Sequence, residues 1–380
     1  MKSHFPSRKS LFAALGLVAA NSFFSGCVED SIAGRDENPP DDTASTLLRR
    51  VYVATSDYTS GLLLSFDADS LKRGPDSLEI HSDSRIVSHG EYLYVLERFG
   101  ADNILKYDPV AGRVVYQKHL ADMANPADIG FHDDSTAYVA MENTTTFLKV
   151  DPRTGTLRDS VDLSDYIFTP DSGQGEKAQS PHAFAVQVSG DTVFLGLQRR
   201  NGDYRFPGGA SFILMLDANT LAVLDTLVAP GSNASVLWMD EDGIYLACQG
   251  ALTDLTDGGI YRWDKTDWQA TTLFSGEAIA GNITSVVCDT QARCYASVGK
   301  SWPNTQILSL DFKTRTVQDS LPGLKEAGGG LAWDAKTGRL WVGERNATQS
   351  GLVVFDAQRE KVGATLKTGL PPADLHLARR

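Results

Sequence analysis

Short runs of apolar, aromatic and β-branched residues recur along this chain and favour β-strands over helices. About ten residues after each run comes an apolar residue followed by Asp, which begins a polar turn. An Asp side chain can accept a hydrogen bond from the backbone two residues further on, so each position predicts a tight hairpin. The seven pairs are Phe66-Asp67, Tyr107-Asp108, Val150-Asp151, Leu216-Asp217, Trp263-Asp264, Leu310-Asp311 and Phe355-Asp356.

Each repeat predicts four antiparallel strands, here called strands A to D. Strand A is rich in small residues, as in 181–186, strand B is the apolar run, and strands C and D flank the Asp hairpin. A repeat of about 40 to 55 residues has the length of one blade of a β-propeller. The pattern therefore predicts an all-β fold, a seven-bladed β-propeller with four-stranded antiparallel blades.

The two ends of the chain predict how the ring closes. The first repeat starts directly at strand B (51–55), and no strand A precedes it. The missing strand is found at the other end, where 371–380 repeats the pattern of 125–131. We expect residues 371–380 to form the innermost strand of the first blade, which removes the exposed sheet edges.

These runs resemble the YVTN-type seven-bladed propellers, a superfamily that also contains bacterial lactonases and domains similar to quinoprotein amine dehydrogenases. The resemblance rests on 51–55, on 137–141 and on strand A segments of the Pro-x-x-apolar type, and it covers residues 51–380. The shared residues are those that build blades, so the resemblance implies the fold and leaves the activity open.

The N-terminal segment has the pattern of an export signal. Lys2, Arg8 and Lys9 precede an apolar run too short to span a bilayer, and Phe24-Ser25-Gly26-Cys27 resembles a bacterial lipobox. We predict a signal peptide at 1–26, lipid attachment at Cys27 with an acidic flexible tether over 27–50, and the propeller at 51–380. An ordinary leader with an incidental Cys is the alternative. The location expected is the bacterial cell envelope, at the outer membrane.

Charge limits the partners. The formal net charge is −13, and removing the three leader cations takes it to −16. Such a body repels nucleic acid and anionic lipid headgroups, so we expect a membrane contact through the lipid anchor only. No metal-ligand cluster, phosphate-binding loop or nucleophile elbow is found, and we predict no metal and no cofactor.

Three further cysteines follow Cys27. Cys288 and Cys294 flank a predicted hairpin turn, and export favours their oxidation. They form either a cross-strand disulfide or two reduced thiols in a buried strand. Cys248 is expected to be a small buried apolar residue.

The irregular connections lie between strands B and C and between strands D and A, which emerge on one face of the ring. The longest are 164–182, 198–211 and 249–259, and we expect them to adjoin one another. Cations beside aromatic rings suit a carboxylate, a sugar or a protein. The candidate ligand-binding residues are Arg199, Arg200, Tyr204, Arg205 and Phe206, with Trp302 and Phe99 on other loops of the same face. The alternative is a solvated hairpin tip.

Two functions from different classes follow from these residues. The first is a monomeric, non-enzymatic binding or scaffold lipoprotein for an envelope protein or carbohydrate, which we favour because the sequence shows no catalytic constellation. The second is a lactonase-like or other hydrolase at the central channel, in which His182 acts with channel-facing carboxylates and should lie within hydrogen-bond reach of a carboxylate or metal. A buried strand-start histidine is the simpler interpretation of His182. Polar residues recur at or after the ends of strands B: Glu97, Glu142, Gln198, Gln249 and Glu344. They either line the mouth of the channel or mark the places where strands meet water, and we favour the second interpretation.

Overall fold

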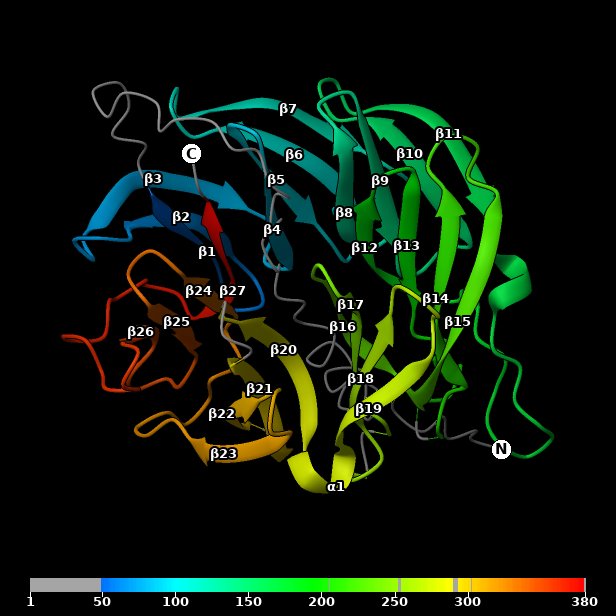
Figure 1. Cartoon of the computed structure of the whole chain (residues 1–380). Coiled ribbons are helices and arrows are strands. Elements are labelled where there is room, and N and C mark those ends of the chain that lie inside the picture. The colour runs from blue at the N-terminus through cyan, green and yellow to red at the C-terminus, as the bar shows by residue number, and fades with distance from the viewer. Residues whose placement is uncertain (1–48, 205, 252–253, 290–292, 302, 379–380) are drawn as a thin grey trace, which may run out of the picture.

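The computed structural model describes residues 49–380 except 205, 252–253, 290–292, 302 and 379–380. Seven sheets surround a common centre (Figure 1), and each sheet is one blade that corresponds to one sequence repeat. Blade 1 consists of β27 (Pro372–Ala378), β1 (Arg50–Ser56), β2 (Gly61–Asp67) and β3 (Arg73–Ile80). Blade 2 consists of β4 (Ser84–His89), β5 (Tyr92–Glu97), β6 (Asn103–Asp108) and β7 (Arg113–His119). Blade 3 consists of β8 (Pro126–Asp133), β9 (Thr136–Met141), β10 (Thr146–Asp151) and β11 (Thr156–Asp162).

The other four blades follow in chain order. Blade 4 consists of β12 (Ala183–Ser189), β13 (Thr192–Leu197), β14 (Ala210–Asp217) and β15 (Val223–Ser232). Blade 5 consists of β16 (Ala234–Met239), β17 (Gly243–Cys248), β18 (Gly259–Asp264) and β19 (Ala270–Ser275). Blade 6 consists of β20 (Asn282–Cys288), β21 (Arg293–Ser301), β22 (Asn304–Asp311) and β23 (Thr316–Ser320). Blade 7 consists of β24 (Leu331–Asp334), β25 (Arg339–Glu344) and β26 (Gly351–Phe355). The seven-bladed, all-β prediction is confirmed.

Burial explains why the strand B runs read as continuous apolar segments. Every residue of β1 and of β17 is buried, because each inner strand has a neighbouring blade on both faces. The outermost strands β7 and β11 are almost wholly exposed. The apolar clusters lie between adjacent blades, as where Tyr94 and Ile104 of blade 2 pack with Val139 of blade 3. The core is thus a ring of seven interfaces.

The Asp hairpins form as the sequence predicts. Strands β2, β6, β10, β14, β18 and β22 end at the expected Asp, and Asp356 directly follows β26. Each of the seven carboxylates accepts at least one backbone N–H of its own turn, as Asp217 does from Asn219 at 3.0 Å and from Thr220 at 2.8 Å. These bonds lower the pKa of the Asp217 carboxyl below its ordinary value.

Ring closure by the C-terminal strand is confirmed. Strand β27 pairs antiparallel with β1, from Arg50 opposite Ala378 to Thr55 opposite Pro372. In Figure 1 the red β27 lies beside the blue strands of blade 1. Blade 1 is therefore built from one strand of the C-terminus and three of the N-terminus.

Blade 7 departs from the expected four strands. Its sheet has three, and the position of strand D is taken by the irregular segment 356–369. This segment contacts β26 through two isolated bridges, Leu352 with Leu366 and Phe355 with Lys361. Gly363 in a left-handed conformation (φ 68°) interrupts the segment between these bridges, so a continuous ladder does not form.

Side chains also link each blade to the next. In every case a side chain of one blade bonds a backbone group of the innermost strand of the following blade, or of the segment leading into it. The partners are Asp374 with Ile86, Arg85 with Ala127, Asp128 with Val186, Gln198 with Ala234, Ser235 with Ile283, Ser297 with Ala327 and Arg345 with Pro372, at 2.5 to 2.8 Å. Inner strands are sheet edges whose backbone groups need partners, and these links supply them.

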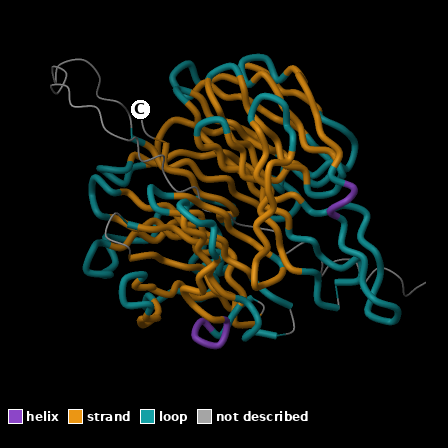
Figure 2. Tube along the Cα trace, turned by 45° about the vertical axis from the view of Figure 1, so that its right-hand side comes forward, coloured by secondary structure: helices purple, strands orange, loops and turns teal. Residues whose placement is uncertain are grey.

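The remaining features are local. Figure 2 shows helical turns only in two connections, at Ser164–Tyr166 and Gly276–Ile279 (α1). Within the described residues no helix is long and apolar enough to cross a membrane. Cys288 and Cys294 lie opposite each other on β20 and β21 and are joined by a disulfide, while Cys248 is a buried free thiol.

Candidate functional site

We call the face with the B to C and D to A connections the loop face, and its centre the mouth of the axis. Two of its long connections, 163–182 and 198–209, bind each other. The Asn201 side chain accepts from the Glu176 N–H at 2.9 Å and donates to the Gln174 carbonyl at 2.8 Å. The Gly202 N–H donates to the Glu176 carbonyl at 2.8 Å. These two connections adjoin as expected; the third, 249–258, closes on itself through Asp257, which accepts the Ala251 N–H.

Two cations of this sector, Arg199 and Arg200, already have partners within the chain. The Arg199 guanidinium stacks on Phe212 at 3.8 Å and donates to the carbonyls of Tyr166 and Ala210 at 3.0 and 2.9 Å. Arg200 forms an ion pair with Glu142 of blade 3. Both side chains therefore fix the loop to its surroundings. Arg205 and Trp302 lie outside the described residues.

Exposed aromatic rings gather on the loop face. Among the described residues every exposed Phe or Tyr lies in a B to C connection, and an exposed Met lies in a D to A connection. They are Tyr58 and Phe99 (each 54% exposed), Tyr204 (51%), Phe206 (38%) and Met123 (57%). The other large exposed apolar residues are aliphatic and lie on outer strands or one C to D turn: Val110, Val114, Val115, Leu157, Val223, Leu224 and Val228. Aromatic rings and Met are the side chains enriched at recognition surfaces.

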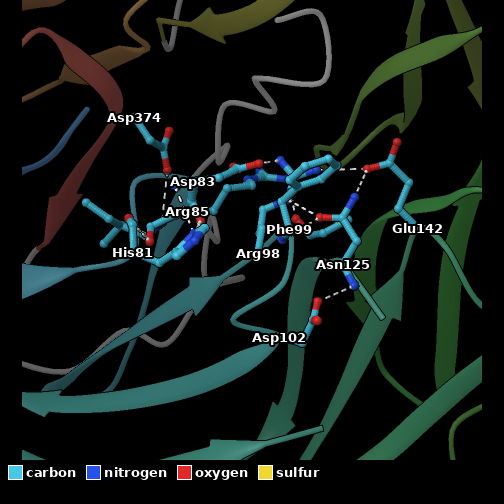
Figure 3. A network of polar contacts seen from close by, with 12 residues as sticks. His81, Asp83, Arg85, Arg98, Phe99, Asp102, Asn125, Glu142 and Asp374 are labelled. Atoms are coloured by element: carbon cyan, nitrogen blue, oxygen red, sulfur yellow. Dashed lines mark hydrogen bonds and ion pairs between the residues drawn. The ribbon is translucent and has the colours of Figure 1, made fainter. Parts of the chain in front are cut away.

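A buried charge network lies at the mouth between blades 2 and 3 (Figure 3). Arg98, 2% exposed, donates to Glu142 at 2.8 Å and to Asn125 at 3.2 Å, and lies 3.6 Å from Asp83. Asn125 also donates to Glu142, at 2.8 Å. Burial opposes ionisation of Glu142, but Arg200 and Arg98 hold the pKa of its carboxyl below the ordinary value. The network ties together three blades.

The sequence contains a signal for the pairing of Arg98 with Glu142, and it can be found from the strand register. Leu93 lies opposite Tyr107, and Ala137 lies opposite Val150, in each case the residue before the hairpin Asp. Arg98 follows Leu93 by five residues, and Glu142 follows Ala137 by five. Opposite charges therefore occupy equivalent positions in adjacent blades.

The interpretation of the polar strand B ends as water-exposed is wrong. All five side chains are buried: Glu97, Glu142, Gln198, Gln249 and Glu344. Glu344, for example, accepts the backbone N–H groups of Lys325 and Glu326 at 2.8 and 2.9 Å. Such carboxylates hold the connections in place because buried backbone donors need acceptors.

His182 lies at the mouth, directly before β12, in a left-handed conformation (φ 55°). Burial and the adjacent Arg200 lower its pKa to about 3, against the opposing effect of Glu142, so the imidazole is neutral at pH 7. Its Nδ1 atom is buried with no hydrogen-bond partner among the described residues. The contact that the hydrolase alternative needs, a hydrogen bond between His182 and a carboxylate, is not among those found in the described part of the chain.

Two buried carboxyls lie on either side of Arg85 in the inner strands. Asp374 and Asp128 occupy equivalent strand A positions in blades 1 and 3. Burial raises the pKa of Asp374 to about 6, although Arg85 lowers it, and burial also raises the pKa of Asp128. His376, two residues beyond Asp374, has its pKa lowered to about 4 by burial, and its Nε2 lies 2.6 Å from the Ser88 hydroxyl.

These opposite shifts predict an unusual dependence of stability on pH. Because the pKa of Asp374 is higher in the folded state, its contribution falls as pH rises from about 4 to 6. His376 contributes oppositely, since its lowered pKa makes stability rise between about 4 and 6.5. In D374N the Asp374 contribution is lost, while those of His376 and Asp128 remain. The free energy of unfolding of D374N relative to the native chain should increase by about 2 to 3 kcal/mol between pH 4 and pH 7.

Urea unfolding at half-unit pH steps measures this difference. D128N is a parallel test, because Asp128 also bonds the next blade and also has a raised pKa. Its free energy of unfolding relative to the native chain should likewise increase with pH. A difference between D374N and the native chain that is constant from pH 4 to pH 7 would contradict the assignment.

No group of three or more potential metal-ligating side chains occurs among the described residues. Fold and closure define the protein as a seven-bladed β-propeller, and solved structures of low sequence identity are similar to it in fold. A putative 6-phosphogluconolactonase from Bacteroides fragilis NCTC 9343 has 14% identity over 90% of this chain and 100% of that chain, with a TM-score of 0.64. A functionally unknown protein from Desulfotomaculum acetoxidans DSM 771 has 10% identity over 87% and 99%, with a TM-score of 0.60.

The dihydro-heme d1 dehydrogenase NirN has 14% identity over 90% of this chain and 77% of that chain, with a TM-score of 0.57. At these identities the likeness establishes the propeller fold alone. No protein-family model matches this chain, and no curated protein matches it.

Proposed function

We propose that this protein is an extracytoplasmic, lipid-anchored binding or scaffold propeller that presents its loop face to a protein or carbohydrate of the cell envelope. The observation that carries the proposal is the segregation of exposed side chains. The rings of Tyr58, Phe99, Tyr204 and Phe206 lie on the loop face, whereas the exposed aliphatic residues lie elsewhere.

Backbone geometry supports the same surface. Tyr58 and Phe99 have φ values of 72° and 43°, a region that bulky residues rarely adopt. Their turns are held by local bonds, since the Tyr58 N–H donates to the Ser56 hydroxyl at 2.9 Å. Such strain costs roughly 1 to 3 kcal/mol per residue and is found chiefly at functional sites. These two turns hold large rings exposed to solvent, although the left-handed conformation also occurs in C to D turns, at Leu71, Leu221 and Trp268.

A four-site variant tests this surface. Y58N, F99N, Y204S and F206S together remove the rings, and Asn tolerates the left-handed conformation at the first two sites. The variant should lose the partners that the native chain captures from envelope extracts, because a few residues, often aromatic, carry most of the binding energy in such interfaces. Partners are identified by mass spectrometry of proteins and by composition analysis of glycans.

The matched control removes four exposed aliphatic side chains from the blade edges, with V110S, L157S, L224S and V228S. This control should keep the native partner set. If both variants capture the same partners as the native chain, the loop face is not the binding surface.

Lipid anchoring has its own test. C27S should abolish incorporation of labelled palmitate and release the protein from the membrane fraction, because the thiol is the acylation site of a lipobox. Labelled C248S is the control, and it should remain membrane-bound. Retention of label and membrane association by C27S would contradict anchoring at this residue.

A further inference from the structure

Two repeated positions bring polar side chains to the mouth of the axis. The first lies five residues after the strand B residue that faces the hairpin, and it holds Arg98, Glu142, Gln198, Gln249 and Arg345. The second lies at the start of strand A: Asn125, His182 and Asn233 directly precede the strand, and Asn282 is its first residue. Because the positions are equivalent, these residues occupy corresponding places around the mouth of the axis.

Hydrogen bonding among the side chains at the mouth is uneven. On the side of blades 2 and 3, Arg98, Asn125 and Glu142 satisfy one another. Three atoms on the side of blades 4 to 6 are buried and have no partner among the described residues: Oε1 of Gln198, Nδ1 of His182 and Oδ1 of Asn282. Buried polar atoms without partners are uncommon, and three of them at one end of the axis call for an explanation such as a bound group.

Gln198 fixes the kind of group required. Its Nε2 donates to the Ala234 carbonyl at 2.8 Å, which sets the orientation of the amide and leaves Oε1 as a free acceptor. Gln198 is 7% exposed, and its backbone N–H donates to the His182 carbonyl at 3.0 Å, so the two side chains are neighbours. An acceptor needs a donor, so an ionised carboxylate cannot satisfy Oε1.

Neutral hydroxyl groups fit this arrangement. A hydroxyl donates one hydrogen bond and accepts others, so it can serve both an amide oxygen and either tautomer of a neutral imidazole. The three side chains with unpartnered atoms are uncharged, and the nearby charges of Arg98, Arg200 and Glu142 pair with one another. The exposed rings on the same face, including Phe99 and Tyr204, offer flat apolar surfaces on which the C–H face of a sugar ring can stack.

We propose that the mouth of the axis is a saccharide-binding site in which Gln198, His182 and Asn282 bond the hydroxyls of a neutral sugar. This proposal rests on the proposed function, because it places a carbohydrate at the loop face. It adds the class of ligand and the residues that select it.

Calorimetric titration of the purified full-length protein tests the site. The probes are glucose, N-acetylglucosamine, maltotriose and chitotriose, with sodium acetate, sodium phosphate and ethylammonium chloride as comparison solutes. At least one of the four saccharides should bind, and Q198M and N282A should each weaken that binding about tenfold or more, as expected for loss of a buried hydrogen bond.

The controls separate binding from folding. Q198M also loses the link to Ala234, so N282A, which breaks no hydrogen bond found for the Asn282 side chain, is the second variant. Q269M changes an exposed glutamine in a C to D turn and should bind as the native chain does. Midpoints of thermal unfolding are recorded for all variants.

Three outcomes overturn the proposal: no saccharide of the panel binds, an ion binds and the saccharides do not, or N282A and Q198M bind as tightly as Q269M. If saccharide binding fails while the four-site aromatic variant still loses its envelope partners, the proposed function stands and only this site is rejected. If both fail, the loop face has neither role.

Discussion

Deleting residues 371–380 is expected to prevent the chain from folding into a cooperative domain. Strand β27 supplies the ladder partners of β1 and buries Ala373 and Leu375 between blades. Losing about six backbone hydrogen bonds and this apolar area removes on the order of 10 kcal/mol, which is comparable to the whole stability of a domain. The open edge of β1 also becomes available for pairing between chains.

Circular dichroism during heating and size-exclusion chromatography measure the effect. The truncated chain should show a broad transition or none and should elute as aggregates. Deleting only residues 379–380, which follow β27, is the control and should leave the midpoint nearly unchanged. A truncation at 371 that stays monomeric with the native midpoint would contradict closure by β27.

Replacing Glu142 with Ala is expected to destabilise the protein by about 3 to 5 kcal/mol, because it leaves a buried guanidinium without its closest carboxylate. Arg98 would keep its bond to Asn125 and its longer contact with Asp83, and neither replaces the close carboxylate. Chemical unfolding measures the change in the free energy of unfolding. The double variant R98M/E142M should recover most of the loss, since it removes both charges and keeps apolar volume.

An exposed pair gives the matched comparison. Lys336 and Asp69 lie 4.0 Å apart with both side chains more than half exposed. K336A should change stability by less than about 1 kcal/mol, as is usual for surface pairs. If E142A costs no more than K336A, the network at the mouth does not hold the blades together.

The blade pattern and the closure could be predicted from sequence because both depend on local features. Apolar strand B runs and Asp turns are local in sequence, and each Asp bonds its own turn. The copy of strand A at 371–380 needed only a comparison with 125–131. The irregular edge of blade 7 was not predicted, because it depends on how one short segment fits against β26.

The site was harder to predict because its contacts join distant segments. Arg199 looked like a free cation in its loop, but its guanidinium stacks on Phe212 and bonds Tyr166 from another connection. Burial of the polar strand B ends depends on the loops that cover them, which no local pattern shows. The pairing of Arg98 with Glu142 could have been found by counting register across repeats.

The most direct measurement is disulfide trapping between the two ends of the chain. Val53 of β1 lies opposite Leu375 of β27, at the separation of adjacent strands that a disulfide can bridge. With C248S removing the buried free thiol, the V53C/L375C chain should form an intramolecular bond on mild oxidation, seen by mass spectrometry of its peptides. Free thiols at both sites in the folded, oxidised protein, or bonds only between different chains, would contradict a ring closed by its last strand.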